Sequence, residues 1–189
     1  VYYLVRRSSA ITTAAVLTDN WIDVPAFDKA GTADCVNGLT AVTYEAIVRV
    51  HDFHYAGPTS SYIEEKLSTI MGVEQHLLLR IGDTNFYADQ LQVDGSGVSL
   101  GSYDAFRQLC GDISEVRVWS VARTQADIWR DMYDVENPAE KPELRAYWKF
   151  NEGTGNIIKD WSQYGNDAVA HTDLKWNTSV EIPQLNKQE

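Results

Sequence analysis

The sequence has few cysteines, an excess of acidic residues and no long apolar run. Its two cysteines, Cys35 and Cys110, are too few for a disulfide scaffold and lack the CxxC spacing of zinc or redox sites, so they can pair or stay free. Lys and Arg total 16 against 27 Asp and Glu, and the formal charge of -11 repels phosphate backbones. No run of about 18 apolar residues is present. These absences argue against nucleic acid as a partner and against direct membrane insertion.

Signatures of nucleotide-dependent enzymes are also missing. The chain has no phosphate loop or dinucleotide fingerprint. A glycoside hydrolase needs two carboxylates about 5–10 Å apart, one of them with a raised pKa. Here Glu115 stands with Arg117 on one predicted strand and Glu45 with Arg49 on another, and such neighbours favour the ionised carboxylate. The sequence therefore favours a protein without catalytic residues, and leaves a glycoside hydrolase or its accessory domain as the alternative.

What the chain does contain is short β-branched and aromatic runs broken by Gly, Asn, Asp and Pro, the pattern of an antiparallel β-sandwich. The 189 residues fit one domain spanning 1–189. The predicted strands are Tyr2–Arg7, Trp21–Val24, Thr43–Val50, Leu67–Met71, Leu77–Ile81, Phe86–Val93, Ile113–Trp119, Arg145–Phe150, Asp167–His171 and Ser179–Ile182.

One segment departs from this pattern and predicts a peripheral α-helix over Thr124–Val135. Ile128, Met132 and Val135 recur at helical spacing. Thr124 can cap the first turn, with Asp127 three residues on completing a variant of the capping box. Asn137-Pro138 then stops the helix, which we expect to cover one end of the sandwich.

Three ordered motifs resemble bacterial laminin-G-like domains of the concanavalin A-like lectin and glucanase type. They are Thr43–Arg49, the stretch from Gly111 to Trp119 with its continuation to Thr124, and the stretch from Ala146 to Asp167 with its Gly- and Asn-rich turn. Between Val93 and Gly111 the chain has room for fewer strands than the family usually carries. The resemblance implies an all-β, antiparallel jelly-roll β-sandwich and a carbohydrate-binding, lectin-like role.

The resemblance also implies where such a protein works. Members of this family are frequently attached to surface lipoproteins or glycosidases, so we expect an extracellular, cell-surface or periplasmic location and a larger parent chain. Residues 1–15 look like the junction with a preceding domain. A glycan or polysaccharide is then the expected partner, and a protein adhesion module is a further alternative.

Strand alternation sorts one set of polar residues onto a single face. If the strands at Thr43, Ile113 and Arg145 are neighbours, as in the family, they share Glu45, Arg49, Glu115, Arg117, Tyr147 and Lys149. This face can bind sugar hydroxyls beside an aromatic ring, or it can consist of structural ion pairs. The predicted ligand-binding residues, from this face and from loops, are Tyr103, Phe106, Arg117, Trp119, Tyr147 and Tyr164.

Calcium is a further possibility, because oxygen ligands in loops are what this ion requires. Asp160 and Asp167 lie near the last turn and Asp23 near an early strand, and the ends of a sandwich often lie side by side. The predicted metal ligands are Asp23, Asp160 and Asp167. No other cofactor is expected.

Overall fold

The computed structural model describes residues 13–17, 20–24, 39–52, 67–72, 78–82, 99–100 and 109–180. Strands account for most of the regular structure, with one short α-helix and one 3-10 turn in the described part of the chain. The elements are β1 (Ala14–Leu17), β2 (Ile22–Asp23), β3 (Thr43–Asp52), β4 (Leu67–Gly72), β5 (Leu78–Gly82), β6 (Ser99–Leu100), β7 (Cys110–Trp119), α1 (Gln125–Arg130), the 3-10 turn Pro138–Glu140, β8 (Leu144–Trp148), β9 (Ile157–Ile158), β10 (Ala168–Ala170) and β11 (Lys175–Asn177).

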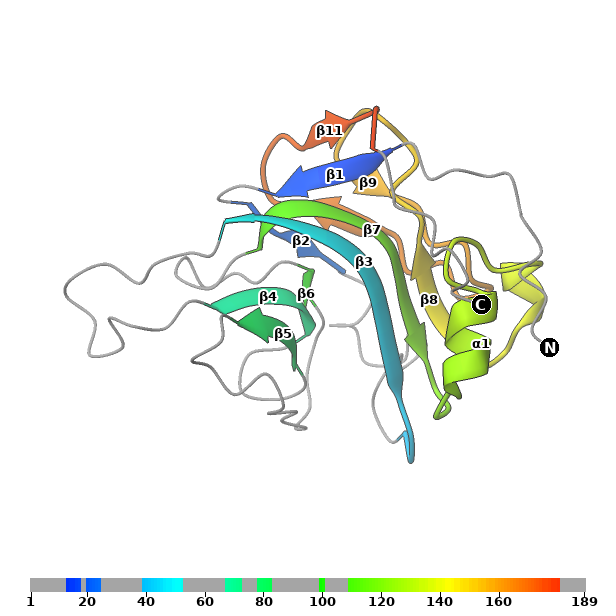
Figure 1. The fold of residues 1–189 in the computed structure, drawn as a ribbon. Helices are drawn as coiled ribbons and strands as arrows, with labels where there is room; N and C mark the ends of the chain where they lie inside the picture. Colours follow the sequence, from blue (N-terminus) through cyan, green and yellow to red (C-terminus); the bar gives the residue numbers. More distant parts are fainter. Residues whose placement is uncertain are drawn as a thin grey trace.

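The strands form two antiparallel sheets, which confirms the predicted all-β sandwich. Among the described residues, sheet 1 has the order β11-β1-β7-β3, with β8 also paired to β7, and sheet 2 has the order β5-β4-β6-β2-β10-β9. The chain crosses between the sheets several times, for example from β1 to β2 and from β2 to β3 (Figure 1). Segments distant in sequence therefore become neighbours, as in the pairing of β1 with β11.

The central strand of sheet 1 is β7, which changes partner along one of its edges. Gly111 to Ile113 pair with β1, whereas Val116 to Trp119 pair with β8. Glu115 lies between these two stretches with φ 51, and the β3–β7 register shifts there. An extra residue of this kind is a β-bulge, which bends a strand and resets its alternation. The bulge lets Ile113 face the same core as Val116 and Val118.

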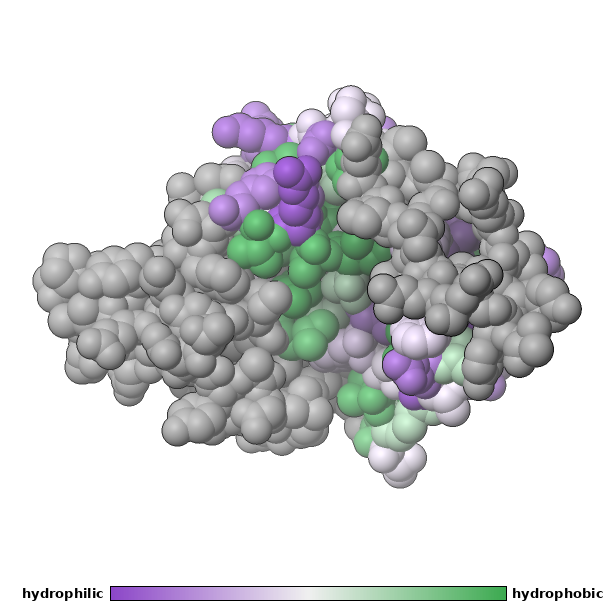
Figure 2. Space-filling model, viewed as in Figure 1, coloured by the Kyte–Doolittle hydropathy of each residue, from purple (hydrophilic) through white to green (hydrophobic). Residues whose placement is uncertain are grey.

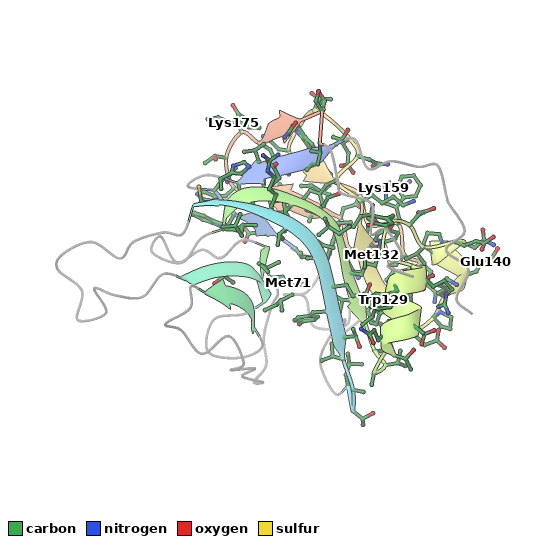
Figure 3. All side chains as sticks on the ribbon, in the orientation of Figure 1. Met71, Trp129, Met132, Glu140, Lys159 and Lys175 are labelled. Atoms are coloured by element: carbon green, nitrogen blue, oxygen red, sulfur yellow. The ribbon has the colours of Figure 1, made fainter. Side chains whose placement is uncertain are left out.

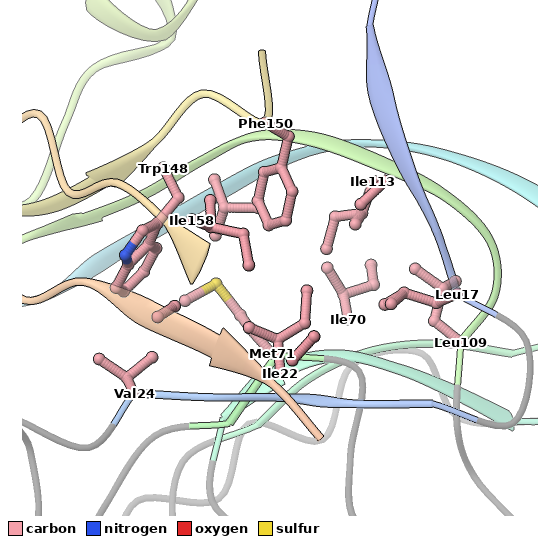
Figure 4. Packing of buried hydrophobic residues seen from close by; sticks show 14 of the residues in the cluster. Leu17, Ile22, Val24, Ile70, Met71, Leu109, Ile113, Trp148, Phe150 and Ile158 are labelled. Atoms are coloured by element: carbon pink, nitrogen blue, oxygen red, sulfur yellow. The ribbon is translucent and has the colours of Figure 1, made fainter. Parts of the chain in front are cut away.

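The space between the sheets is filled by one hydrophobic core. Figure 4 shows Trp148, Phe150 and Ile113 of one layer facing Ile22, Ile70 and Met71 of the other. Hydrophobic residues gather at the centre of the view in Figure 2. Tyr44, Ala46, Val48 and Val50 pack against this core, on the side of β3 opposite to the predicted polar face.

The predicted helix exists but is shorter than expected. Thr124 caps it as predicted, because its hydroxyl oxygen accepts the backbone N–H of Asp127 at 3.2 Å. The helix ends at Arg130 rather than at Val135. The Met132 carbonyl accepts a hydrogen bond from Arg117 of β7, so tertiary contacts take over from helical bonds after one and a half turns. α1 lies beside β7 and β8 (Figure 1).

Seven predicted strands overlap observed ones, and four observed strands were missed. The missed strands are β1, β6, β9 and β11, each only two to four residues long and too short to show a period. The predicted strands at 2–7 and 86–93 lie outside the described residues, as does most of the 83–108 region. The strand predicted at 179–182 is wrong at 179–180, which follow β11 without belonging to a strand, and its other two residues lie outside the described ranges. Most of the predicted junction 1–15 lies outside them too, although Ala14 and Ala15 belong to β1. No helix in the described ranges is long and apolar enough to cross a membrane.

Candidate binding surfaces

The predicted polar face exists, and its centre is a buried charge network built on Arg117. One nitrogen of Arg117 donates to Glu45 at 3.1 Å, and the other donates to Glu115, to the Met132 carbonyl and to the Tyr147 hydroxyl. The Tyr147 hydroxyl in turn donates to Glu115. The β3–β7–β8 register causes this convergence, because it places Glu45, Arg117 and Tyr147 in one cross-strand row.

A second arginine, Arg123, links α1 and the residues next to it to this network. Arg123 donates to Glu45 at 2.6 Å, to the carboxylate of Asp131 and to the carbonyl of Asp127. Its guanidinium also lies 4.0 Å above the ring of Trp119. These contacts tie both ends of the helix to the outer face of sheet 1, so the helix covers the network.

Burial and charge shift the carboxyl groups of the network in opposite directions. Burial raises the pKa of Glu115 above its ordinary value, and the charge of Arg117 and the Tyr147 hydrogen bond only partly offset this effect. Burial also acts to raise the pKa of Asp131, but hydrogen bonds from Arg130 and Arg123 outweigh it and hold that pKa below its ordinary value. The sequence-based expectation that Arg117 keeps Glu115 ionised by lowering its pKa is therefore wrong, because desolvation has the larger effect on this pKa.

Three of the predicted ligand-binding residues are sealed into the outer layer of sheet 1. Arg117 is 1% exposed, Trp119 is 4% exposed and Tyr147 is fully buried. Trp119 and Tyr147 share a small apolar cluster with Leu144 and Val135. These contacts agree with the structural interpretation of the polar face, in which ion pairs hold the strands in register. The three side chains are not part of an accessible surface.

The loop aromatics fall into two groups. Tyr103 and Phe106 lie outside the described residues. The half-buried Tyr164 donates its hydroxyl to the Pro142 carbonyl at 2.8 Å and accepts a bond from Arg145 at 3.0 Å. Tyr164 is thus the one predicted aromatic in the described chain whose ring stays partly open to solvent.

The predicted metal ligands are only partly brought together. Asp160 is 3% exposed, and its carboxylate accepts four hydrogen bonds, from the N–H groups of Tyr147, Ser162 and Asn166 and from the Ser162 hydroxyl. Asp167 accepts the Asp160 N–H at 2.9 Å. Asp23 lies on β2, and no group of three acidic, His or Cys residues in the described ranges is placed to hold a metal ion. Asp160 therefore organises a turn.

A further surface, which no sequence pattern singles out, is the outward side of β2, β9 and β10. Alternation sends Ile22, Ile158 and Ala168 into the core and leaves their neighbours on the other side. Ile157 pairs with Val169, which pairs with Asp23, and the two aliphatic side chains are 61% and 38% exposed.

An aromatic pair stands next to this row. The rings of Trp21 and His171 stack with centroids 3.7 Å apart, and the His171 N–H donates to the Trp21 carbonyl at 2.9 Å. The two residues are 150 positions apart in the sequence, so no local motif predicts that they form a pair.

Buried Asn20 fixes the backbone on both sides of the pair. Its side-chain oxygen accepts the N–H of Trp21 at 2.9 Å and the N–H of Thr172 at 3.2 Å. Asn20 is 3% exposed. Asn20 therefore links the residues before β2 to the residues after β10 by hydrogen bonds.

Comparison with known proteins gives one structural relative. No family model matches the sequence, and no curated protein matches it. The fold resembles the crystal structure of a "putative carbohydrate binding protein" from Bacteroides ovatus, with a TM-score of 0.65 and 23% identity. The match covers 92% of this chain and 62% of the other, so this chain spans less than two thirds of its relative. The two proteins share a fold.

Proposed function

We propose that the protein is a non-catalytic carbohydrate-binding module of the laminin-G-like, concanavalin A-like lectin type. The observation that carries the proposal is the likeness of the whole sandwich to the Bacteroides ovatus protein over 92% of this chain. The three ordered sequence motifs support the same type, since Thr43–Arg49, Gly111–Trp119 and the turn after β8 all lie in sheet 1 or against it.

The arrangement of carboxylates supports a binding role over hydrolysis. Glu45 and Glu115 lie on adjacent strands, and both bind the guanidinium of Arg117. They are 8% and 4% exposed, so a sugar chain cannot reach them. A general acid must contact the glycosidic oxygen, and neither carboxyl group can do so here.

The proposal includes a setting for the module. A lectin-like sandwich of this type fits a secreted or cell-surface protein, in an extracellular or periplasmic location and as part of a longer chain. Glycans or polysaccharides are its proposed partners. Tyr103, Phe106 and Tyr164 remain candidate contacts in the loops.

Binding of the unmodified protein to an array of oligosaccharides and polysaccharides tests the proposal. We expect specific binding without release of reducing sugar from any bound polysaccharide. Release of reducing sugar would favour the hydrolase instead. A specific protein captured in a matched pull-down, together with an array on which no glycan binds, would favour adhesion and overturn the lectin proposal.

A further inference from the structure

The outer face of sheet 2 has the composition of a small amphipathic binding surface. We define this surface by Asp23, Ile157, Val169 and the Trp21–His171 pair. Ile157 and Val169 are adjacent in register and face solvent, although side chains of this type are normally buried. The next position in this row is Asp23 on β2, which is exposed and which pairs in turn with Ser99 of β6. Apolar carbon and a charged oxygen acceptor thus stand side by side.

The Trp21–His171 pair extends the surface by one step along the strands. Because Ala170 pairs with Ile22 and both face the core, the next position along each strand returns to the outer side. His171 is exposed and Trp21 is half-buried, so the imidazole presents the outer edge of the stack. An imidazole can both donate and accept hydrogen bonds.

The surface is held in place before any ligand arrives. Buried Asn20 fixes the backbone of Trp21 and of Thr172, the residue after His171. β10 is paired on both sides, with β2 and with β9. A rigid surface of this kind loses little conformational entropy when it binds, which favours affinity.

The size of the surface points to a small ligand. Three neighbouring strands span about 10 Å, and one two-residue step along a strand adds about 7 Å. A stable protein interface buries about 800 Å² on each partner, several times what this surface offers. A short oligosaccharide matches the size, since the C–H face of a sugar ring can lie on Ile157 and Val169 while its hydroxyls reach Asp23 and His171.

The charge of the protein selects among sugars. The formal net charge is -11, and Asp23 adds a carboxylate at the surface itself. Sulfated or uronic acid chains would be repelled by both. We propose that the outer face of sheet 2 binds a neutral glycan, with Ile157 and Val169 under the sugar ring and the Trp21–His171 pair and Asp23 at its edges. This inference rests on the proposed carbohydrate-binding function and assigns a site to it.

The test compares two surface variants with a matched control on an array of neutral and anionic oligosaccharides. The variants are Ile157→Ser combined with Val169→Ser, and His171→Ala; the control is Trp129→Ala, an aromatic residue 59% exposed on α1, away from β9 (Figure 3). For the best neutral ligand, we expect the combined variant to bind about tenfold more weakly or worse, because it loses two apolar contacts. Binding by the control should equal that of the unmodified protein.

The outcomes separate the site from the function. Unchanged affinity in both surface variants, with normal binding by the unmodified protein, overturns this site and leaves the carbohydrate-binding function standing. Binding restricted to anionic glycans overturns the neutral class. If the unmodified protein binds no glycan, the function itself fails and the site with it. Melting temperatures equal to that of the unmodified protein confirm that the variants fold, as expected for side chains outside the core.

Discussion

At the scale of single residues, Arg117 of β7 joins three other segments of the described chain. Its guanidinium contacts β3 through Glu45, β8 through Tyr147 and the chain after α1 through the Met132 carbonyl. Its side chain is 2% exposed. A buried charge of this kind is tolerated only while its partners remain, because each partner removes part of the cost of taking the charge out of water.

Replacing Arg117 by Met should lower the free energy of unfolding by about 3–5 kcal/mol, since Glu45 and Glu115 would be left buried without their shared partner. Urea unfolding monitored by tryptophan fluorescence measures this. The matched control is Arg49→Met, an exposed arginine on β3, which should change stability by less than about 0.5 kcal/mol. Equal effects of the two substitutions would contradict the structural role of the network.

The pH dependence of stability should separate Glu115 from Asp131. Because the pKa of Glu115 is raised in the folded state, its contribution to stability falls as the pH rises from the unfolded value of about 4.3 through the folded pKa. The pKa of Asp131 is lowered, so its contribution is present above the unfolded value of about 3.9 and is lost as the pH falls through the folded pKa.

Glu115→Gln and Asp131→Asn test these opposite signs in urea titrations between about pH 3 and pH 7. The stability of the unmodified protein relative to Glu115→Gln should decrease as the pH rises. Its stability relative to Asp131→Asn should decrease as the pH falls. Two differences that change in the same direction would show that the assignment of one shift is wrong.

At the scale of elements, α1 is held by its cap and by ion pairs more than by its own length. Six residues are too few for a helix that is stable alone in water. Thr124 satisfies a backbone N–H at the start, and Arg123 and Arg130 bind Asp131 at the end. The helix therefore depends on contacts with sheet 1.

Thr124→Ala should lower the free energy of unfolding by about 1 kcal/mol, because the N–H of Asp127 loses its acceptor. Thermal or urea unfolding measures the change. Thr124→Ser keeps the oxygen and serves as the control, with stability near that of the unmodified protein. A loss as large in the serine variant would assign the effect to the missing methyl group.

At the scale of the whole molecule, both ends of the described chain close the sandwich. β1 pairs with β11, and Asn20 links β2 to Thr172. The turn after β8 is closed by Asp160, whose carboxylate oxygens are occupied by donors from the protein itself. The fold is thus completed at this turn by hydrogen bonds where the sequence had suggested a calcium ion.

Calcium should therefore leave the melting temperature unchanged, and so should EDTA. A bound ion at one hundred times its Kd would add about 2.7 kcal/mol to the stability, a shift easily seen by calorimetry. A melting temperature that rises with calcium and falls back with EDTA would contradict this prediction. In that case Asp160→Asn would show whether the turn is involved.

The sequence by itself determined the class of fold and the facing of β3 and β8. The apolar sets of β3 and β8 are those expected from alternation, and Thr124 caps α1 as its position predicts. These features depend on residues close together in the chain, whose periodicity and hydrogen-bonding capacity are legible locally.

Only the tertiary structure decided which surfaces are accessible. Alternation places Arg117 and Tyr147 on the outer face of a sheet, but the chain around α1 folds back and buries them. The bulge at Glu115 changes the facing of Ile113, and the Trp21–His171 pair joins distant positions. Burial and long-range pairing depend on how the whole chain packs. A periodic sequence pattern indicates that a side chain points away from the core, but it does not indicate which other segment covers that side chain.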